Sequence, residues 1–178
     1  MIVLVGASAS GKTELAKILF NKYGYKKCIT TTTRKPRNNE INDVDYHFLT
    51  KDAFLKLKND DKFLEVSLYD HHYYGMQIKD VMYKGVVVVD PNGANAISQK
   101  ICDQAFIVYV ETKKEIRIKR MELRGDQIDK INRRVRNDED VFVQSRLKQI
   151  DLVINNDEQD LNILAALIHK KYEEKYNV

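Results

Sequence analysis

The chain has 178 residues, of which 43% are hydrophobic and 31% are charged, and its formal net charge is +4. This length fits one α/β domain with small insertions, and the apolar share is enough for a substantial core. The small net charge predicts no nucleic-acid partner, and no apolar run approaches the roughly 20 residues of a membrane-spanning helix, so no membrane partner is expected.

The chain opens with an apolar segment, Ile2–Val5, that has the composition of a buried strand. It carries neither a basic leader nor a cleavage site of small residues, so we expect no signal peptide. Cys28 and Cys102 lie far apart in the sequence and match no metal or redox spacing. We expect both to be buried as small hydrophobic side chains. Together these features predict a protein of the reducing cytoplasm.

A loop directly after this strand has the pattern Gly, four residues, Gly, Lys, and Ser or Thr. Its residues are Gly6, Ala7, Ser8, Ala9, Ser10, Gly11, Lys12 and Thr13. Between a strand and a helix, this pattern predicts backbone N–H groups that cradle phosphate, aided by the positive end of the helix dipole. Lys12 would reach the β- and γ-phosphates of ATP, and the Thr13 hydroxyl would bind Mg²⁺. The alternative is a glycine-rich turn that binds nothing, and the match is too specific to favour it.

The next part of the chain, residues 31–85, does not continue the pattern of long apolar strands. It contains a polar loop, a helical pattern at Lys51–Lys58 and alternating stretches within Phe63–Tyr74. These features predict a small insertion of short strands beside the main sheet. Arg34 and Arg37 flank a proline in the polar loop, and their guanidinium groups suit an anion. The alternative interpretation is an ordinary basic loop.

Apolar strands return at Val86–Val89 and Phe106–Val110, with a shorter one at Leu152–Ile154. Continuous apolar runs of this kind are typical of parallel strands that are covered on both faces. Helical patterns separate them, and strands that alternate with helices predict βαβ units. The expected fold is therefore α/β, with a P-loop NTPase-like parallel sheet, helices on both of its faces, and a small mixed α/β insertion.

Residues 112–136 are the most basic part of the chain. They contain ten Lys or Arg and four Asp or Glu, a balance of +6. One interpretation is a solvated helical hairpin held by ion pairs. The other is a basic segment that serves the triphosphate bound by the loop.

Four further motifs follow the phosphate loop in a fixed order. They are Thr32-Thr33-Arg34-Lys35-Pro36-Arg37, Asp43-Val44-Asp45-Tyr46-His47-Phe48, Phe63-Leu64-Glu65 and Tyr73-Tyr74-Gly75. Together with the phosphate loop they resemble the guanylate kinase family, which carries Thr-Thr-Arg-x-Pro-Arg, then Gly-x-Asp-Tyr-x-Phe, then a Glu in a strand, then Tyr-Gly. The resemblance runs essentially from end to end.

The resemblance implies an acceptor site for guanosine monophosphate (GMP) in the insertion. The residues that would hold its phosphate are Arg34, Arg37, Tyr46 and Tyr74. Glu65 would accept hydrogen bonds from the N1–H and N2 amino groups of guanine, and Thr30 would face the base oxygen. This role suits a carboxylate, which offers two acceptor oxygens to guanine's two adjacent donors. Adenine lacks that donor pair and would leave the carboxylate unpaired.

The resemblance also implies a helical lid in residues 112–149. Arg120, Arg124 and Arg134 match the family's arginines that close over the triphosphate, and Asn155 matches a position near the adenine ring. The whole chain, residues 1–178, would form a single domain. Its parts would be a core (1–30, 86–111 and 150–178), an acceptor-binding insertion (31–85) and the lid (112–149).

Several positions depart from the family pattern. Ala9 stands where the family has Gly, and because alanine favours negative φ, we expect the backbone to differ there. Asn39 and Asp43 replace glycines of the polar loop that contains Arg34 and Arg37, here called the acceptor loop. We expect both residues to keep left-handed turns. Met76 stands where the family has Ser or Thr, which would remove a hydroxyl from the acceptor pocket.

A further departure concerns two acidic positions at the end of the apolar segment Val86–Val89. The family has two acidic residues there, whereas this chain keeps only Asp90 and has Val88 in the other place. Asp90 is therefore a candidate carboxylate at the acceptor or at the metal. The alternative is a plain helix cap before Pro91.

The predicted function is transfer of a phosphoryl group from ATP to GMP with Mg²⁺, giving ADP and GDP. One alternative is a kinase of the same fold for another phosphorylated acceptor. Met76 favours it, and the combination of Arg34, Arg37, Tyr46 and Glu65 argues against it. Another is a non-catalytic guanylate-kinase-like module that binds phosphopeptides. Such modules typically lack an intact phosphate loop, whereas Lys12 and Thr13 are present. ATP and GMP are the expected partners, and the chain is expected to be a monomer or a homodimer.

Overall fold

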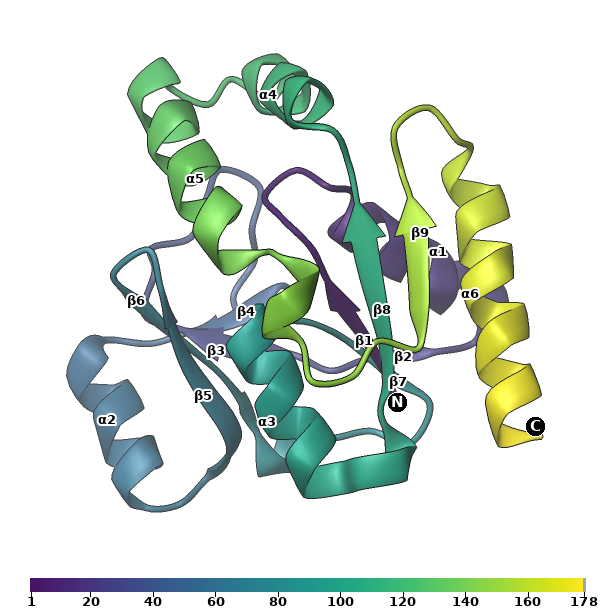
Figure 1. The fold of residues 1–178 in the computed structure, drawn as a ribbon. Helices are drawn as coiled ribbons and strands as arrows, with labels where there is room; N and C mark the ends of the chain where they lie inside the picture. Colours follow the sequence, from purple (N-terminus) through teal and green to yellow (C-terminus); the bar gives the residue numbers. More distant parts are fainter. Residues whose placement is uncertain (178) are drawn as a thin grey trace.

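The computed structural model describes residues 1–177 and contains two sheets (Figure 1). Val178, the last residue of the predicted core, lies outside the described residues. The larger sheet is parallel and has the strand order β2-β7-β1-β8-β9. Its strands are Lys26–Lys27 (β2), Gly85–Val88 (β7), Ile2–Val5 (β1), Phe106–Glu111 (β8) and Leu152–Asn155 (β9). The prediction of a parallel sheet from the four apolar segments is confirmed.

Helices cover both faces of this sheet, as its apolar strands require. They are α1 (Lys12–Tyr23), α3 (Pro91–Ile101) and α6 (Leu161–Tyr176). Ile2 and Leu4 of the central strand pack in one cluster with α1 and α6. Val3 and Val5 point to the other face, where they pack with α3. Because successive side chains of a strand alternate between faces, a strand covered on both sides is apolar throughout.

The second sheet occupies the predicted insertion and has the strand order β4-β3-β6-β5. Its elements are β3 (Thr30–Thr32), β4 (Tyr46–Phe48), β5 (Phe63–Tyr69), β6 (His72–Gln77) and the helix α2 (Lys51–Asn59). The β3–β4 pair is parallel and the other pairs are antiparallel, so the sheet is mixed. Phe54 of α2 is buried and stacks on Phe63, with ring centroids 4.5 Å apart. The helix and this sheet therefore form a small layer beside the main sheet (Figure 1).

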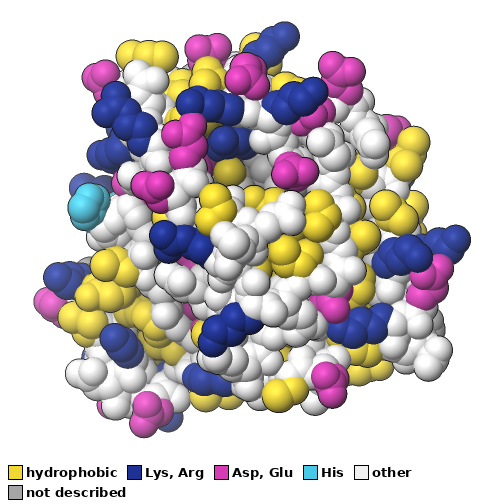
Figure 2. Space-filling view, in the orientation of Figure 1, with side chains coloured by type: hydrophobic (Ala, Val, Ile, Leu, Met, Phe, Trp, Pro, Cys, Tyr) yellow, Lys and Arg dark blue, Asp and Glu magenta, His cyan; other side chains and the backbone are white. Residues whose placement is uncertain are grey.

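The predicted helical hairpin is also present. Its helices, α4 (Lys114–Leu123) and α5 (Ile128–Val141), follow β8 and lie beyond the carboxyl ends of the parallel strands (Figure 1). Met121, Ile131 and Val135 form a small buried cluster between them. Figure 2 shows basic side chains interspersed with acidic ones over this upper part of the molecule.

Three short 3₁₀ helices connect these elements, at Ile78–Asp80, Cys102–Gln104 and Gln144–Arg146. Asn39 and Asp43 have φ angles of 74° and 62°, so the expected left-handed turns of the acceptor loop are confirmed. The expectation for the cysteines is half wrong, because Cys28 is buried while Cys102 is exposed. Cys102 ends α3 and is not part of its packed face. Within residues 1–177, no helix is both long enough and apolar enough to cross a membrane.

Candidate active site

One cavity of about 440 Å³ lies at the carboxyl ends of the parallel strands. Open α/β sheets typically bind ligands in this position. Its lining residues come from four places: the phosphate loop and the start of α1 (Gly6, Ser8, Ala9, Ser10, Gly11, Lys12, Thr13, Glu14); the second sheet and its loop (Thr30, Arg37, Tyr46, Glu65, Ser67, Tyr69, Tyr74); the end of β7 and the next turn (Val88, Val89, Asp90); and the hairpin region (Arg120, Arg124, Arg134, Phe142). Parts of the chain far apart in the sequence thus share one site.

The phosphate loop ends in a glycine that the packing requires. Gly11 caps α1 with a φ of 95°, and a Cβ there would lie 2.2 Å from Asn156 Nδ2. That amide nitrogen donates to the Ser10 carbonyl at 2.8 Å. Gly11 therefore lets Asn156 pack against the loop. The first residues of α1 line the cavity, where an anion would meet the positive end of the helix dipole.

Lys12 begins α1, and its ammonium group folds back over the phosphate loop. Its Nζ donates to the Ala7 carbonyl at 2.7 Å and lies 3.3 Å from Ser10 Oγ. Burial lowers the pKa of Lys12 to about 8, although the nearby Asp138 carboxylate opposes that shift. Below that pKa the side chain is a partly desolvated cation, which attracts a polyphosphate more strongly than a solvated one does.

Ala9 has a left-handed backbone conformation. Its φ is 60°, although alanine favours negative φ. The left-handed region costs an alanine on the order of 1–2 kcal/mol. The methyl group of Ala9 packs against the cluster of Met121, Ile131 and Val135, which gives the loop a contact that glycine cannot make.

Glu65 reaches the cavity from β5 of the second sheet and is almost completely buried. Its Oε1 accepts a hydrogen bond from the Met76 N–H at 2.9 Å. Its Oε2 has no hydrogen-bond partner within residues 1–177. Burial, together with the nearby charge of Asp90, raises the pKa of Glu65 to about 8. Gly93 allows this approach, because a Cβ there would lie 3.1 Å from Glu65 Oε2.

Alternation along β5 brings two further residues to the cavity. Glu65, Ser67 and Tyr69 are two apart, so their side chains share one face of the second sheet, and all three line the cavity. Of the three, only Glu65 was predicted from the sequence. Ser67 and Tyr69 could have been predicted as well, because every second residue after Glu65 in a strand lies on the same face.

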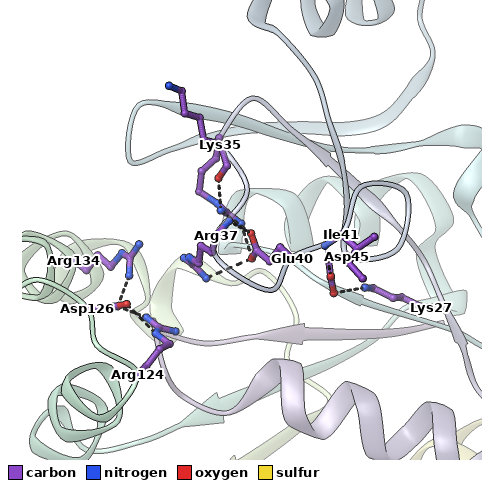
Figure 3. A network of polar contacts seen from close by, with 10 residues as sticks. Lys27, Lys35, Arg37, Glu40, Ile41, Asp45, Arg124, Asp126 and Arg134 are labelled. Atoms are coloured by element: carbon purple, nitrogen blue, oxygen red, sulfur yellow. Dashed lines mark hydrogen bonds and ion pairs between the residues drawn. The ribbon is translucent and has the colours of Figure 1, made fainter.

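The two arginines of the acceptor loop differ in position. Arg34 donates to both carboxylate oxygens of Glu40 at 2.9 Å, and its guanidinium lies over the Tyr46 and Phe48 rings. It is not among the residues that line the cavity, whereas Arg37, Tyr46 and Tyr74 are. Figure 3 shows Arg37 between Glu40 and the arginines of the hairpin.

The three arginines predicted for the lid all line the cavity. Arg124 and Arg134 both contact the Asp126 carboxylate, the latter at 2.7 Å (Figure 3). Arg120 donates instead to the Asn156 carbonyl at 2.9 Å. The charges of Arg124 and Arg134 contribute to lowering the pKa of Arg37, after burial and the charge of Arg34. Cations from the hairpin and from the acceptor loop thus face a common space.

Three other predicted residues are placed as follows. Asp90 caps α3, accepting from the Gly93 N–H at 2.9 Å, so the cap interpretation is confirmed, and Asp90 also lines the cavity. The Met76 side chain is fully buried and packs in the core, although its pairing with Thr30 and Glu65 puts it on the face of the second sheet that carries those two cavity residues. Asn155 is exposed at the end of β9, does not line the cavity, and accepts from the Asp157 N–H.

The fold and the phosphate loop define a nucleotide-binding protein of the P-loop class. Comparison with known proteins is more specific. The guanylate kinase family model matches residues 1–171. Guanylate kinases of Campylobacter jejuni strain RM1221 and of C. jejuni subsp. jejuni serotype O:2 are both 31% identical to this chain, over 94% of its length and 87% and 86% of theirs. The chain therefore belongs to the guanylate kinase family.

A solved structure supports the same fold. The crystal structure of guanylate kinase from Anaplasma phagocytophilum aligns with 98% of this chain and 85% of its own, with a TM-score of 0.71 and 21% sequence identity. The second sheet and the hairpin thus belong to a known arrangement of this α/β fold.

Proposed function

We propose that this protein transfers the γ-phosphoryl group of ATP to GMP, giving ADP and GDP. One observation carries the proposal: a single cavity is lined both by an intact phosphate loop and by the buried Glu65 carboxyl group. One oxygen of that group has no hydrogen-bond partner among the described residues. Phosphoryl transfer needs mainly alignment of the two substrates and positive charge around the transferring group. The cavity supports both, because its two ends suit two different nucleotides and arginines lie between them.

The acceptor would bind with its base at Glu65. Guanine presents N1–H and N2 amino donors side by side, and a carboxylate offers them two acceptor oxygens. Thr30 would face the base oxygen. The phosphate of GMP would then reach Arg37, Tyr46 and Tyr74, which line the same end of the cavity. We propose that Arg34 supports the phosphate site without contacting the phosphate. Its guanidinium donates to Glu40 and lies over the Tyr46 ring.

The donor would bind with its triphosphate along residues 6–13 and its γ-phosphate near Lys12. The oxygen donors present fit Mg²⁺, which takes one or two protein ligands beside phosphate oxygens and water. Thr13 lines the cavity, and Asp90 uses only Oδ1 for its cap. When bound, Mg²⁺ supplies charge neutralisation at the β- and γ-phosphate oxygens. Lys12, Arg120, Arg124 and Arg134 would supply the rest of the positive charge.

The resemblance assigns Asn155 to the adenine ring, but neither Asn155 nor its neighbour Asn156 lines the cavity. Asn156 is buried and donates to the Ser10 carbonyl, and its own carbonyl accepts from Arg120. It therefore connects the phosphate loop to the lid, whereas Asn155 is exposed.

Product analysis tests the proposal. Purified protein is incubated with ATP, Mg²⁺ and GMP, and the nucleotides are separated by ion-exchange chromatography. We expect equal amounts of ADP and GDP, with neither formed when GMP is omitted. ATP consumption that is independent of GMP, or no conversion at all, would contradict the proposed reaction.

The lid should become ordered when both nucleotide sites are filled. In the structure, the Asp126 carboxylate pairs with both Arg124 and Arg134. A bisubstrate analogue would bring several negative charges to the same arginines and so favour closure of α4 and α5. We expect hydrogen exchange in residues 112–136 to slow by about tenfold or more, since each 1.4 kcal/mol of protection is a factor of ten. Equal exchange with and without the analogue would argue against a moving lid.

GMP binding should release a proton near neutral pH. Glu65 has a pKa of about 8 in the free protein, so at pH 7 it is mostly protonated. Guanine requires the carboxylate, so the complex binds fewer protons than the free protein. By linkage, the affinity for GMP rises with pH and levels off above about pH 8. We expect calorimetry in buffers of different ionisation enthalpy to show close to one proton released at pH 7, and none for Glu65→Gln.

A further inference from the structure

Asp138 belongs to the lid helix α5, but its side chain is almost completely buried. The carboxylate accepts hydrogen bonds from three different elements. The donors are the Ser8 N–H of the phosphate loop at 2.7 Å, the Tyr69 O–H of β5 at 2.5 Å and the Arg117 guanidinium of α4 at 3.2 Å. Neither nucleotide site described above uses this carboxylate, although it joins the loop, the second sheet and the lid.

The cost of burial indicates more than a stabilising role. The Asp138 side chain is 0% exposed and that of Arg117 is 8% exposed, so both charges have lost most of their water. Apolar side chains of similar size would stabilise such a position as well or better. What apolar side chains could not provide is a fixed acceptor for the Ser8 N–H.

Ser8 directly precedes the strained position of the phosphate loop. Ala9 has a φ of 60°, which a residue with a Cβ keeps only when its surroundings hold it there. Bonds on both sides provide that hold: Asp138 fixes the Ser8 N–H, and the Ser10 N–H donates to the Ala7 carbonyl at 3.2 Å. Relaxation of Ala9 toward negative φ would reorient the peptide groups next to it, and with them the N–H groups available to phosphate.

We propose that Asp138 is a positioning residue for the triphosphate, which holds Ser8 so that Ala9 keeps its left-handed turn and the loop amides stay directed into the cavity. The inference rests on the ATP site proposed above. It explains why a carboxylate lies in the apolar stripe of α5, where Ile131 and Val135 are its buried neighbours on the helix. It also means that the effect of removing the Asp138 carboxylate should depend on whether residue 9 is alanine or glycine.

A double-mutant cycle tests this dependence. The variants are Asp138→Ala, Ala9→Gly, the double variant, and Asp140→Ala as a control on the exposed face of the same helix. Melting temperature, calorimetric affinity for ATP, and separate KM values for ATP and GMP are measured for each. We expect Asp138→Ala to weaken ATP binding by about tenfold or more, while the KM for GMP changes by less than about threefold. Asp138→Asn keeps an acceptor oxygen and should restore part of the affinity.

In the Ala9→Gly background, glycine takes the left-handed turn without strain, so the loss of Asp138 should weaken ATP binding by less than about threefold. If Asp138→Ala does not fold, the double variant should still fold and bind ATP, and its failure would overturn the proposal. Equal effects of Asp138→Ala in both backgrounds, or equal losses for ATP and GMP, would also overturn it. A wild-type protein without GMP-dependent turnover contradicts the proposed function, whereas an active wild type with Asp138→Ala equal to Asp140→Ala contradicts only this inference.

Discussion

We expect the Lys12→Ala variant to fold normally and to lose turnover of ATP with GMP by on the order of 100- to 1000-fold. The Lys12 ammonium already lies on the phosphate loop, 2.7 Å from the Ala7 carbonyl, in the space that the β- and γ-phosphates would enter. Charge spreads over the transferring phosphoryl group in the transition state, so a partly desolvated cation at this point stabilises the transition state more than the ground state.

The same variant should lose little stability. Burial lowers the pKa of Lys12 from its ordinary value to about 8, which means that the fold disfavours its charged form. Removing the charge therefore removes a desolvation cost together with two hydrogen bonds. Steady-state kinetics and thermal melting give both results. Lys22→Ala, in the exposed last turn of the same helix, is the matched control and should keep full turnover. Near-normal turnover in a folded Lys12→Ala protein would refute the donor site.

The second large effect is expected at the acceptor base. Glu65→Gln keeps the shape of the side chain but replaces one acceptor oxygen with a donor, which would face a donor of guanine. A lost bond to a charged group with an unsatisfied partner is worth on the order of 2–4 kcal/mol, or roughly 30- to 1000-fold in kcat/KM for GMP. The KM for ATP should change little, because Glu65 belongs to the second sheet and, among the described residues, makes no hydrogen bond with the phosphate loop.

The hydrogen bonding of Glu65 provides an internal check on this variant. The Met76 N–H donates to Glu65 Oε1, and the amide oxygen of the Glu65→Gln side chain can still accept that bond, so the second sheet should remain intact. The same chemical change at an exposed site, Glu158→Gln, should leave kcat/KM for GMP unaltered. A Glu65→Gln protein that discriminates GMP from AMP as well as the wild type would show that the base is read elsewhere.

The main sheet was predictable because its signals are local. Ile2–Val5 and Phe106–Glu111 are largely continuous apolar runs, and a glycine-containing loop follows the first of them. Helices on both faces follow from the same observation, since a strand without polar positions has no face left for water. Positive φ at Asn39 and Asp43 was predictable as well, because short polar side chains tolerate left-handed turns.

What could not be predicted depends on contacts between distant parts of the chain. Ala9 has a positive φ, and the preceding Ser8 N–H donates to Asp138 of α5, a contact that nothing in residues 6–13 alone reveals. Met76 packs in a core cluster built from both sheets, and a comparison of residue types alone does not reveal that packing. Asp138 was overlooked, although an acidic residue at a buried position of an apolar stripe is itself a signal.

Acceptor choice shows whether Glu65 and the phosphate loop form one guanylate kinase site. The measurement is kcat/KM of the wild-type protein for GMP, AMP, UMP and CMP at saturating ATP and Mg²⁺, followed by coupled ADP release. A site that pairs a buried carboxylate with guanine's two donors should prefer GMP by about 100-fold or more over each of the others. A value for AMP, UMP or CMP that equals or exceeds the value for GMP would contradict the account.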